Sequence, residues 1–97
     1  MTHASSQSVK VYVHVLASFD TDGCLRPLAL LWEDGRRYRI DRVLDVRSAA
    51  SLRAGGQGDR YTIRVGDRES YLYFERSPSL SGNGLGRWFV ERRVPRA

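Results

Sequence analysis

The feature that most constrains this chain is a two-residue alternation of side-chain character that recurs along much of its length. It is clearest near the start, where Val9, Val11, Val13 and Val15 occupy every second position. Successive side chains of a β-strand point to opposite faces, so this alternation predicts strands that bury one face. β-Branched residues at this density also fit a pleated, half-buried surface. The sequence therefore predicts an all-β fold.

About six strands are expected, and turn-forming residues separate them. Asp34-Gly35 is typical of a type I′ hairpin turn, in which both central residues take positive φ. Gly66-Asp67 predicts another tight turn. Pro27 cannot donate a ladder hydrogen bond, so it marks an edge or a strand start. The expected strands cover residues 9–19, 25–33, 36–47, 60–65, 69–75 and 87–93.

The strand pattern changes twice near the middle of the chain. Val43 and Leu44 are adjacent apolar residues, which predicts a bulge or a bend within the third strand. Residues 48–54 have the composition of one short helical turn, with Ser48 as its N-cap and Gly55 as its stop. The next expected strand would begin at Arg60.

Short turns between consecutive strands predict an antiparallel meander. A flat meander leaves two edges exposed, and a small apolar core favours closure, so we expect a small β-barrel. With 97 residues the chain has the length of one domain. We expect this single domain over residues 9–97, preceded by a disordered polar tail over residues 1–8.

Composition narrows the class of protein. Hydrophobic residues make up 41% of the chain, which is too many for a disordered protein, and no apolar run approaches the ~18 residues of a membrane span. The first eight residues lack the charged start and apolar stretch of a secretory signal. These features predict a cytoplasmic protein without a membrane partner. Cys24 is the only cysteine, so it is expected to be a partly buried structural thiol.

Three segments resemble a family of short, uncharacterised bacterial proteins of the Firmicutes type. They are WEDGRRYRIDRVLDVR at residues 32–47, GGQGDRY at residues 55–61 and RWFVE at residues 87–91. The likeness extends over roughly residues 9–91. The resemblance implies a cytoplasmic bacterial protein. It implies no catalytic or binding residue, because the family has no assigned activity.

The net charge of +5 favours a polyanionic partner such as nucleic acid. Lys10 is the only lysine among the 16 basic residues, so the other 15 are arginines. Guanidinium groups bind phosphate in a bidentate manner and stack on bases, which lysine does poorly. A coding bias toward arginine would give the same composition without any functional meaning.

The candidate nucleic-acid site consists of arginines on two strands. Arg37 and Arg39 project from one face of the third strand, and Arg60 and Arg64 from one face of the fourth. If these faces adjoin, four guanidinium groups would line one surface, with Trp32 as a base-stacking platform. The alternative is a solvated face neutralised by the nearby carboxylates Glu33, Asp41 and Asp45.

Aromatic residues support the same hypothesis, because a small barrel has too little interior for all of them. We expect at least one on the surface, and Trp32 is the best candidate because it lies at the mouth of the Asp34-Gly35 hairpin. Packing in the core is the alternative for most of them. The set is Trp32, Tyr38, Tyr61, Tyr71, Tyr73, Phe74, Trp88 and Phe89.

A glycine-rich loop is the second candidate site. Arg53, Gly55, Gly56 and Gly58 combine bare backbone amides with an arginine, a composition that can form an anion-binding nest. The segment does not match a phosphate-binding loop, which needs Gly-Lys-Ser/Thr between a strand and a long helix. A simple flexible connection is the alternative.

Nothing in the sequence points to catalysis, to a metal site or to a cofactor. His14 lies in the middle of a predicted strand, and His3 lies in the polar tail. Asp41 and Asp45 would share a face of one strand about 13 Å apart, too far for a paired acid and base. The chain is therefore not expected to be an enzyme.

Three functional hypotheses follow. The first is a small barrel that binds RNA or single-stranded DNA through an arginine-rich face. The second is a protein-interaction or assembly module that pairs with itself or another protein through an exposed edge strand or apolar patch. The third, a small enzyme or ligand-binding barrel around the glycine loop, requires a deep pocket with convergent polar groups.

Overall fold

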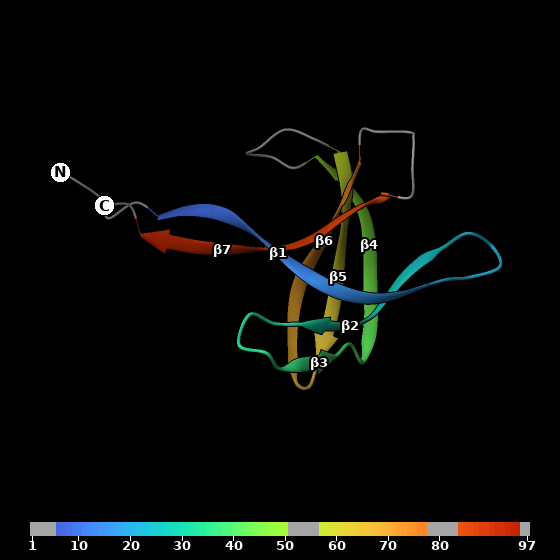
Figure 1. Ribbon diagram of the computed structural model, residues 1–97, viewed down its shortest axis with the longest axis horizontal. Helices are drawn as coiled ribbons and strands as arrows, with labels where there is room; N and C mark the ends of the chain where they lie inside the picture. The colour runs from blue at the N-terminus through green and yellow to red at the C-terminus, as the bar shows by residue number, and fades with distance from the viewer. Residues whose placement is uncertain (1–5, 51–56, 78–83, 96–97) are drawn as a thin grey trace.

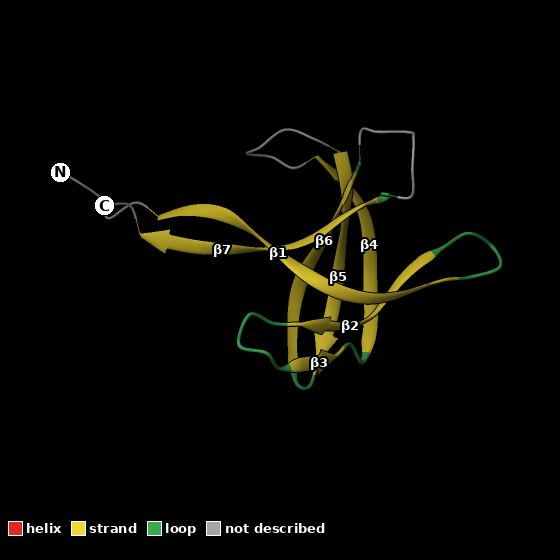
Figure 2. Ribbon diagram, in the orientation of Figure 1, coloured by secondary structure: helices red, strands yellow, loops and turns green. Residues whose placement is uncertain are grey.

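The described part of the chain consists entirely of strands and the turns between them (Figure 2). The structure, a computed structural model, describes residues 6–50, 57–77 and 84–95. The prediction of an all-β fold is confirmed, with seven strands in place of about six. They are β1 (Ser6–Phe19), β2 (Leu25–Leu31), β3 (Arg37–Arg39), β4 (Arg42–Ala50), β5 (Gln57–Val65), β6 (Arg68–Arg76) and β7 (Gly86–Pro95).

All seven strands belong to one antiparallel sheet in the order β3-β2-β1-β7-β6-β5-β4. The order is that of two meanders, β1 to β3 and β4 to β7, joined by the pairing of the first strand with the last. β1 pairs with β7 over its first part, up to Val13, and with β2 from His14 onward. The sheet curls strongly into a half-barrel, and the paired ends of β1 and β7 extend from it as an arm (Figure 1).

The two edges of the sheet are β3 and β4, which follow each other in the chain. The predicted third strand is divided between them at Ile40 and Asp41. The Ile40 N–H donates to the Leu28 carbonyl (2.9 Å) on β2, and the Asp41 N–H donates to the Arg64 carbonyl (2.8 Å) on β5. Two consecutive residues thus connect opposite ends of the sheet, and the half-barrel is closed at this end by the chain itself.

Two hairpins share one turn geometry, which is not the predicted type I′. In the β2–β3 hairpin the Gly35 N–H donates to the Trp32 carbonyl, and the Trp32 N–H donates to the Arg36 carbonyl, both at 2.9 Å. Gly35 has a φ of 83°, but within the described residues no non-glycine residue has positive φ. The turn is therefore a type I turn followed by a left-handed glycine. The β1–β2 hairpin repeats it with Gly23, whose φ is 84°.

The predicted irregularities have different outcomes. The bulge is confirmed, because the β4–β5 register shifts between Val43 and Asp45 and leaves Leu44 as the extra residue. The helical turn over residues 48–54 is wrong for residues 48–50, which continue β4 opposite β5. Pairing with β5 satisfies the backbone groups that a helical turn would have satisfied locally. Residues 51–54 lie outside the described residues.

The start of the first strand also differs from expectation. Residues 6–8, assigned to a disordered tail, belong to β1 and pair with the last residues of β7, Arg93 to Pro95. The prediction for Pro27 is confirmed: it lies where β2 has no neighbour on its outer side, because β3 pairs with β2 only from Ala29 onward.

The core lies on the concave side of the sheet. Its buried members are Leu30, Ile40, Tyr61, Ile63, Leu72 and Phe74. One polar contact crosses this core: the Tyr61 hydroxyl on β5 donates a 2.7 Å hydrogen bond to the Leu25 carbonyl on β2. Burial raises the pKa of the Tyr61 phenol above its ordinary value. The two sides of the half-barrel are thus tied together through the interior.

Two glycines allow β5 and β7 to approach β6 closely from either side. A Cβ atom at Gly58 would overlap the Phe74 carbonyl oxygen, and one at Gly86 would overlap the Glu75 carbonyl oxygen. Gly58 and Gly86 stand opposite Glu75 and Arg76, near the end of β6. The tight curl at this end of the sheet therefore depends on positions without a side chain.

We predict that Gly58→Ala lowers the free energy of unfolding by about 1–3 kcal/mol, because the added methyl group forces the backbone of β6 to shift. The measurement is urea-induced unfolding followed by circular dichroism. Gly84→Ala is the matched control, since a Cβ there meets no atom within 4 Å, and it should change stability by less than about 0.5 kcal/mol. Equal stability of the two variants would contradict the prediction.

Candidate nucleic-acid interface

The convex face of β4, β5 and β6 carries a concentration of arginine. Along β5 the side chains of Tyr61 and Ile63 enter the core, so the alternate residues Arg60, Thr62 and Arg64 project from the opposite, convex face. The register of the sheet then determines which neighbours they meet.

Four arginines form two cross-strand pairs on this face. Arg42 of β4 stands opposite Arg64, and Arg47 of β4 stands opposite Arg60. Like charges directly opposite each other destabilise a pair of strands. Asp45 lies between the two pairs and offsets one of them, since it accepts a 2.8 Å hydrogen bond from the Arg47 Nε. Within the described residues Arg42, Arg60 and Arg64 form no ion pair.

An exposed aromatic ring lies beside these arginines. Tyr71 of β6 stands opposite Thr62 and is 49% exposed, and the Arg60 guanidinium lies 4.5 Å from the centre of its ring. The Arg60 Nε is buried and has no hydrogen-bond partner among the described residues. The expectation that at least one aromatic residue lies on the surface is confirmed by Tyr71.

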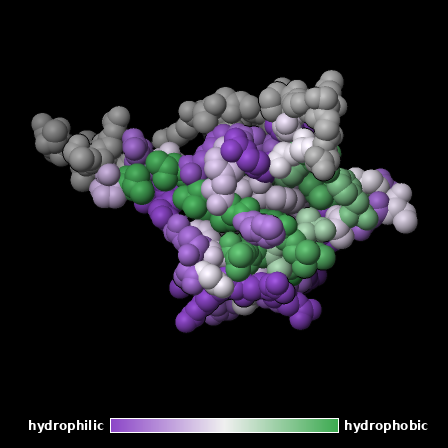
Figure 3. All heavy atoms as spheres, in the orientation of Figure 1, coloured by the Kyte–Doolittle hydropathy of each residue, from purple (hydrophilic) through white to green (hydrophobic). Residues whose placement is uncertain are grey.

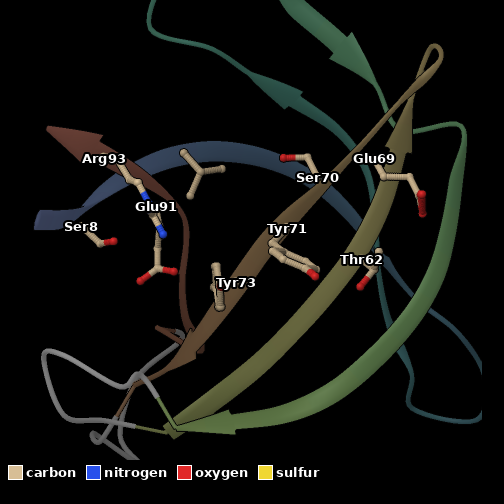
Figure 4. Close-up of a pocket in the computed structure, with 9 residues that line it drawn as sticks. Ser8, Thr62, Glu69, Ser70, Tyr71, Tyr73, Glu91 and Arg93 are labelled. Carbon is tan, nitrogen blue, oxygen red and sulfur yellow. The ribbon is translucent and has the colours of Figure 1, made fainter. Parts of the chain in front are cut away.

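A hollow of about 600 Å³ opens next to Tyr71. β6 and β7 are paired only from Tyr73 to Arg76 of β6. Residues 68–72 of β6 are not paired with β7, and there the two strands diverge. Figure 4 shows Tyr71, Tyr73 and Glu69 on the β6 side of the hollow and Glu91 and Arg93 on the β7 side. It is an open groove between the sheet and the arm, lined by both polar and aromatic side chains.

The base of this region is an aromatic cluster on the convex face. Phe89 is only 2% exposed although it points away from the core, because neighbouring side chains cover it. Tyr73 stacks on it with ring centres 4.9 Å apart, and Tyr12 meets its edge at 5.9 Å. The Lys10 ammonium lies 4.8 Å from the centre of the same ring. The cluster links β1, β6 and β7 and holds Tyr73 in a fixed orientation.

Glu75 joins the cluster to a charge network. It pairs with Lys10, accepts a 2.9 Å hydrogen bond from the Tyr12 hydroxyl and lies 3.5 Å from Arg87. The hydrogen bond from Lys10 lowers the pKa of the Glu75 carboxyl, although burial opposes the shift. The carboxylate is therefore favoured in the folded protein, and its stabilising contribution is lost as the pH falls through the lowered pKa.

The four arginines that the sequence selected lie on two strands that are not neighbours in the sheet. Arg37 and Arg39 are exposed on β3, beside Leu31 and Ala29 of β2, whereas β5 pairs with β4 and β6. No strand pairing therefore aligns the two pairs of arginines. The sequence pattern predicted the arginines of β5 in the present surface, but not Arg42, Arg47 or Tyr71. The missing information is the register, which determines which residues stand opposite Arg60 and Arg64.

The prediction that Trp32 lies exposed requires correction. Its side chain is half-buried and packs against the core, and the Arg92 guanidinium lies 5.5 Å from the ring centre. The curl of the sheet brings β7 over the hairpin, which covers a residue that would be exposed in a flat hairpin. Cys24 differs in the other direction: it is exposed in the β1–β2 turn, and the neighbouring Asp22 carboxylate raises the pKa of its thiol.

Of the glycine-loop candidates, only Gly58 can be located. It belongs to β5 opposite Glu75, where it permits close packing of the strands. Arg53, Gly55 and Gly56 lie outside the described residues. The proposed anion nest therefore stays a prediction.

Apolar side chains also reach the surface on another part of the sheet. Leu16 of β1 and Leu31 of β2 are exposed on the convex side, next to the arginines of β3. In Figure 3 hydrophobic side chains gather over β1 and β2, and hydrophilic ones border them along the lower edge.

No family model, curated protein or solved structure matches the chain. The family resemblance therefore stays a prediction. In the residues that the structure describes, no group of three or more metal-ligating side chains comes together. The same residues contain no helix long and apolar enough to cross a membrane.

We predict that the Tyr73 phenol resists ionisation. Burial, followed by a hydrogen bond to the Glu91 carboxylate, raises its pKa from 10.0 to about 12. Its contribution to stability is fully present below pH 10 and is lost as the pH rises through 12. In an absorbance titration of the five tyrosines, Tyr73→Phe should remove the last step, and Glu91→Gln should move it to lower pH. A wild type whose tyrosines all ionise near pH 10 would disprove this assignment.

Proposed function

We propose that this domain binds single-stranded RNA or DNA through the convex face of β4, β5 and β6. The observation that supports the proposal is the pair of opposed arginines, Arg42 with Arg64 and Arg47 with Arg60, next to the exposed ring of Tyr71. The opposed guanidinium groups repel each other in the free protein. A bound phosphate between the members of a pair relieves this repulsion and accepts hydrogen bonds from both.

The two arginine pairs suit a chain of phosphates. They are separated by about four residues along β5, or about 13 Å, so a bound strand would contact both through different nucleotides. Arg60 is held against Tyr71, which leaves the edge of its guanidinium for a phosphate. Single-strand binders combine such a basic track with aromatic rings on which bases stack.

The neighbouring hollow determines which side of the bound strand faces β6 and which side faces β4 and β5. Glu69 and Glu91 line it and would repel phosphate, so the sugar–phosphate backbone would follow the arginines of β4 and β5. The bases would then point toward Tyr71 and the hollow. Carboxylates there accept hydrogen bonds from base amino groups, as they do from cytosine.

We predict salt-sensitive binding of a fluorescein-labelled single-stranded oligonucleotide, measured by anisotropy. Two phosphate contacts, one at each arginine pair, give a slope of about −1.4 in log K against log salt, or a roughly 7-fold loss of affinity between about 50 and 200 mM salt. Arg42→Ala/Arg64→Ala removes one of these contacts and should reduce the slope by about 0.7. Tyr71→Ala, which removes the stacking platform, should weaken binding by about 5- to 150-fold.

The matched control for the arginines is Arg37→Ala/Arg39→Ala, which removes the same charge from exposed positions on β3. It should leave the salt slope near the wild-type value. Equal losses in the two double variants would mean that net charge, and not this surface, governs binding. Absence of binding by the wild type at low salt would disprove the proposed function.

A further inference from the structure

The outer edge of β4 is a long strand edge without a partner. β4 pairs only with β5, and among the described residues no backbone hydrogen bond joins residues 44–48 to any other strand. β2 comes near the beginning of β4, where Arg26 to Leu28 face Arg42 and Val43 across a small gap. Unpaired donors and acceptors along an edge are a template for another strand.

The side chains on this edge are exposed and partly apolar. Residues 44–48 are all exposed, and Val46 and Leu44 retain 49% and 39% of their accessible surface. Soluble proteins usually protect an edge with lysine, proline or a bulge that twists it away. β4 contains no lysine or proline. Its bulge lies at Leu44, the first residue of the exposed stretch, and the strand is regular from Asp45 onward. The edge is therefore suited to being covered.

The sequence of β4 is complementary to itself. Val46 is the middle residue of the exposed stretch 44–48, so antiparallel pairing about a two-fold axis at Val46 brings this stretch of two copies together. In this register Asp45 stands opposite Arg47 of the second copy, and the same contact recurs on the other side of the axis. Both side chains lie on the convex face, where they already pair within one chain at 2.8 Å. Val46 would pack against Val46 of the second copy.

We propose that two copies of this chain associate along β4 in this register and form a two-fold symmetric dimer with a continuous sheet. The complementarity of charge selects a second copy as the occupant, because a foreign strand would have to supply the same spacing of Asp and Arg. A single strand pair forms a small interface, so self-association is weak and depends on concentration. The dimer does not rest on the proposed nucleic-acid binding.

Charge reversal tests the register. Arg47→Asp places two aspartates opposite each other at both symmetric positions, and Asp45→Arg does the same with two arginines. Sedimentation equilibrium from about 10 µM to about 1 mM should show a wild type that approaches twice the monomer mass. Each single reversal should weaken association by about tenfold or more. A mixture of the two variants should form a heterodimer, and the double variant Asp45→Arg/Arg47→Asp should recover self-association.

Arg36→Asp, an equal charge change in the β2–β3 turn, is the control and should associate like the wild type. Circular dichroism confirms that each variant is folded. A wild type that stays monomeric at the highest concentration overturns the proposal. A dimer that both single reversals leave unchanged overturns it as well. These measurements use protein without nucleic acid, so their outcome is separate from that of the binding experiment.

A disulfide measures the register directly. In a Cys24→Ser background, Val46→Cys places two cysteines on the two-fold axis, with Cα atoms about 4.5–5.5 Å apart as in any directly opposed pair. Ser48→Cys places them about 13 Å apart along the strands, beyond the ~7 Å that a disulfide can bridge. Mild oxidation should cross-link the first variant and leave the second monomeric on a denaturing gel. Equal cross-linking of both would contradict the register.

Discussion

The pairing of the first strand with the last is the interaction on which the rest of the structure depends. Without it, β1 to β3 and β4 to β7 would be two separate meanders, each with only part of a core. β1 is long enough to pair with β7 up to Val13 and with β2 from His14, so a single strand carries the sheet from one meander to the other. These contacts join distant parts of the sequence, and their loop-closure entropy is offset only when the concave face is buried as a whole.

Because the chain ends are paired, the opening of the barrel falls in the middle of the sequence, between β3 and β4. Several features keep it from closing. β3 has only three residues, and Pro27 removes a donor from the stretch of β2 that faces the start of β4. The corner at Ile40 and Asp41 fixes the distance between the two edges at one end, where the Asp41 carboxylate also accepts a 2.8 Å hydrogen bond from the Gly66 N–H. Among the described residues, positions 44–48 of β4 therefore have no partner strand on their outer side.

Local sequence patterns predicted the features that depend on neighbouring residues, but not those that depend on the register between strands. Alternating valines located β1, Val43-Leu44 located the bulge, and Pro27 located an unpaired stretch of β2. The helical turn at Ser48 was wrong because β5 offers backbone partners that no local pattern reveals. For the same reason the arginines of β5 were found but the residues opposite them were not. The exposure of Trp32 was misjudged because the curl of the sheet covers it.

The two proposals concern opposite sides of one strand and are linked through its charges. β4 contributes Arg42 and Arg47 to the convex face through its pairing with β5, and Asp45 and Arg47 also lie on its free edge. A dimer formed along that edge would place the arginine pairs of two copies on one continuous surface, which increases their mutual repulsion. A polyanion bound across this surface would neutralise it. By thermodynamic linkage, a ligand that binds the dimer more tightly than the monomer strengthens dimerisation by the same factor. The charges that weaken self-association of the free protein are therefore those through which a bound polyanion would promote it.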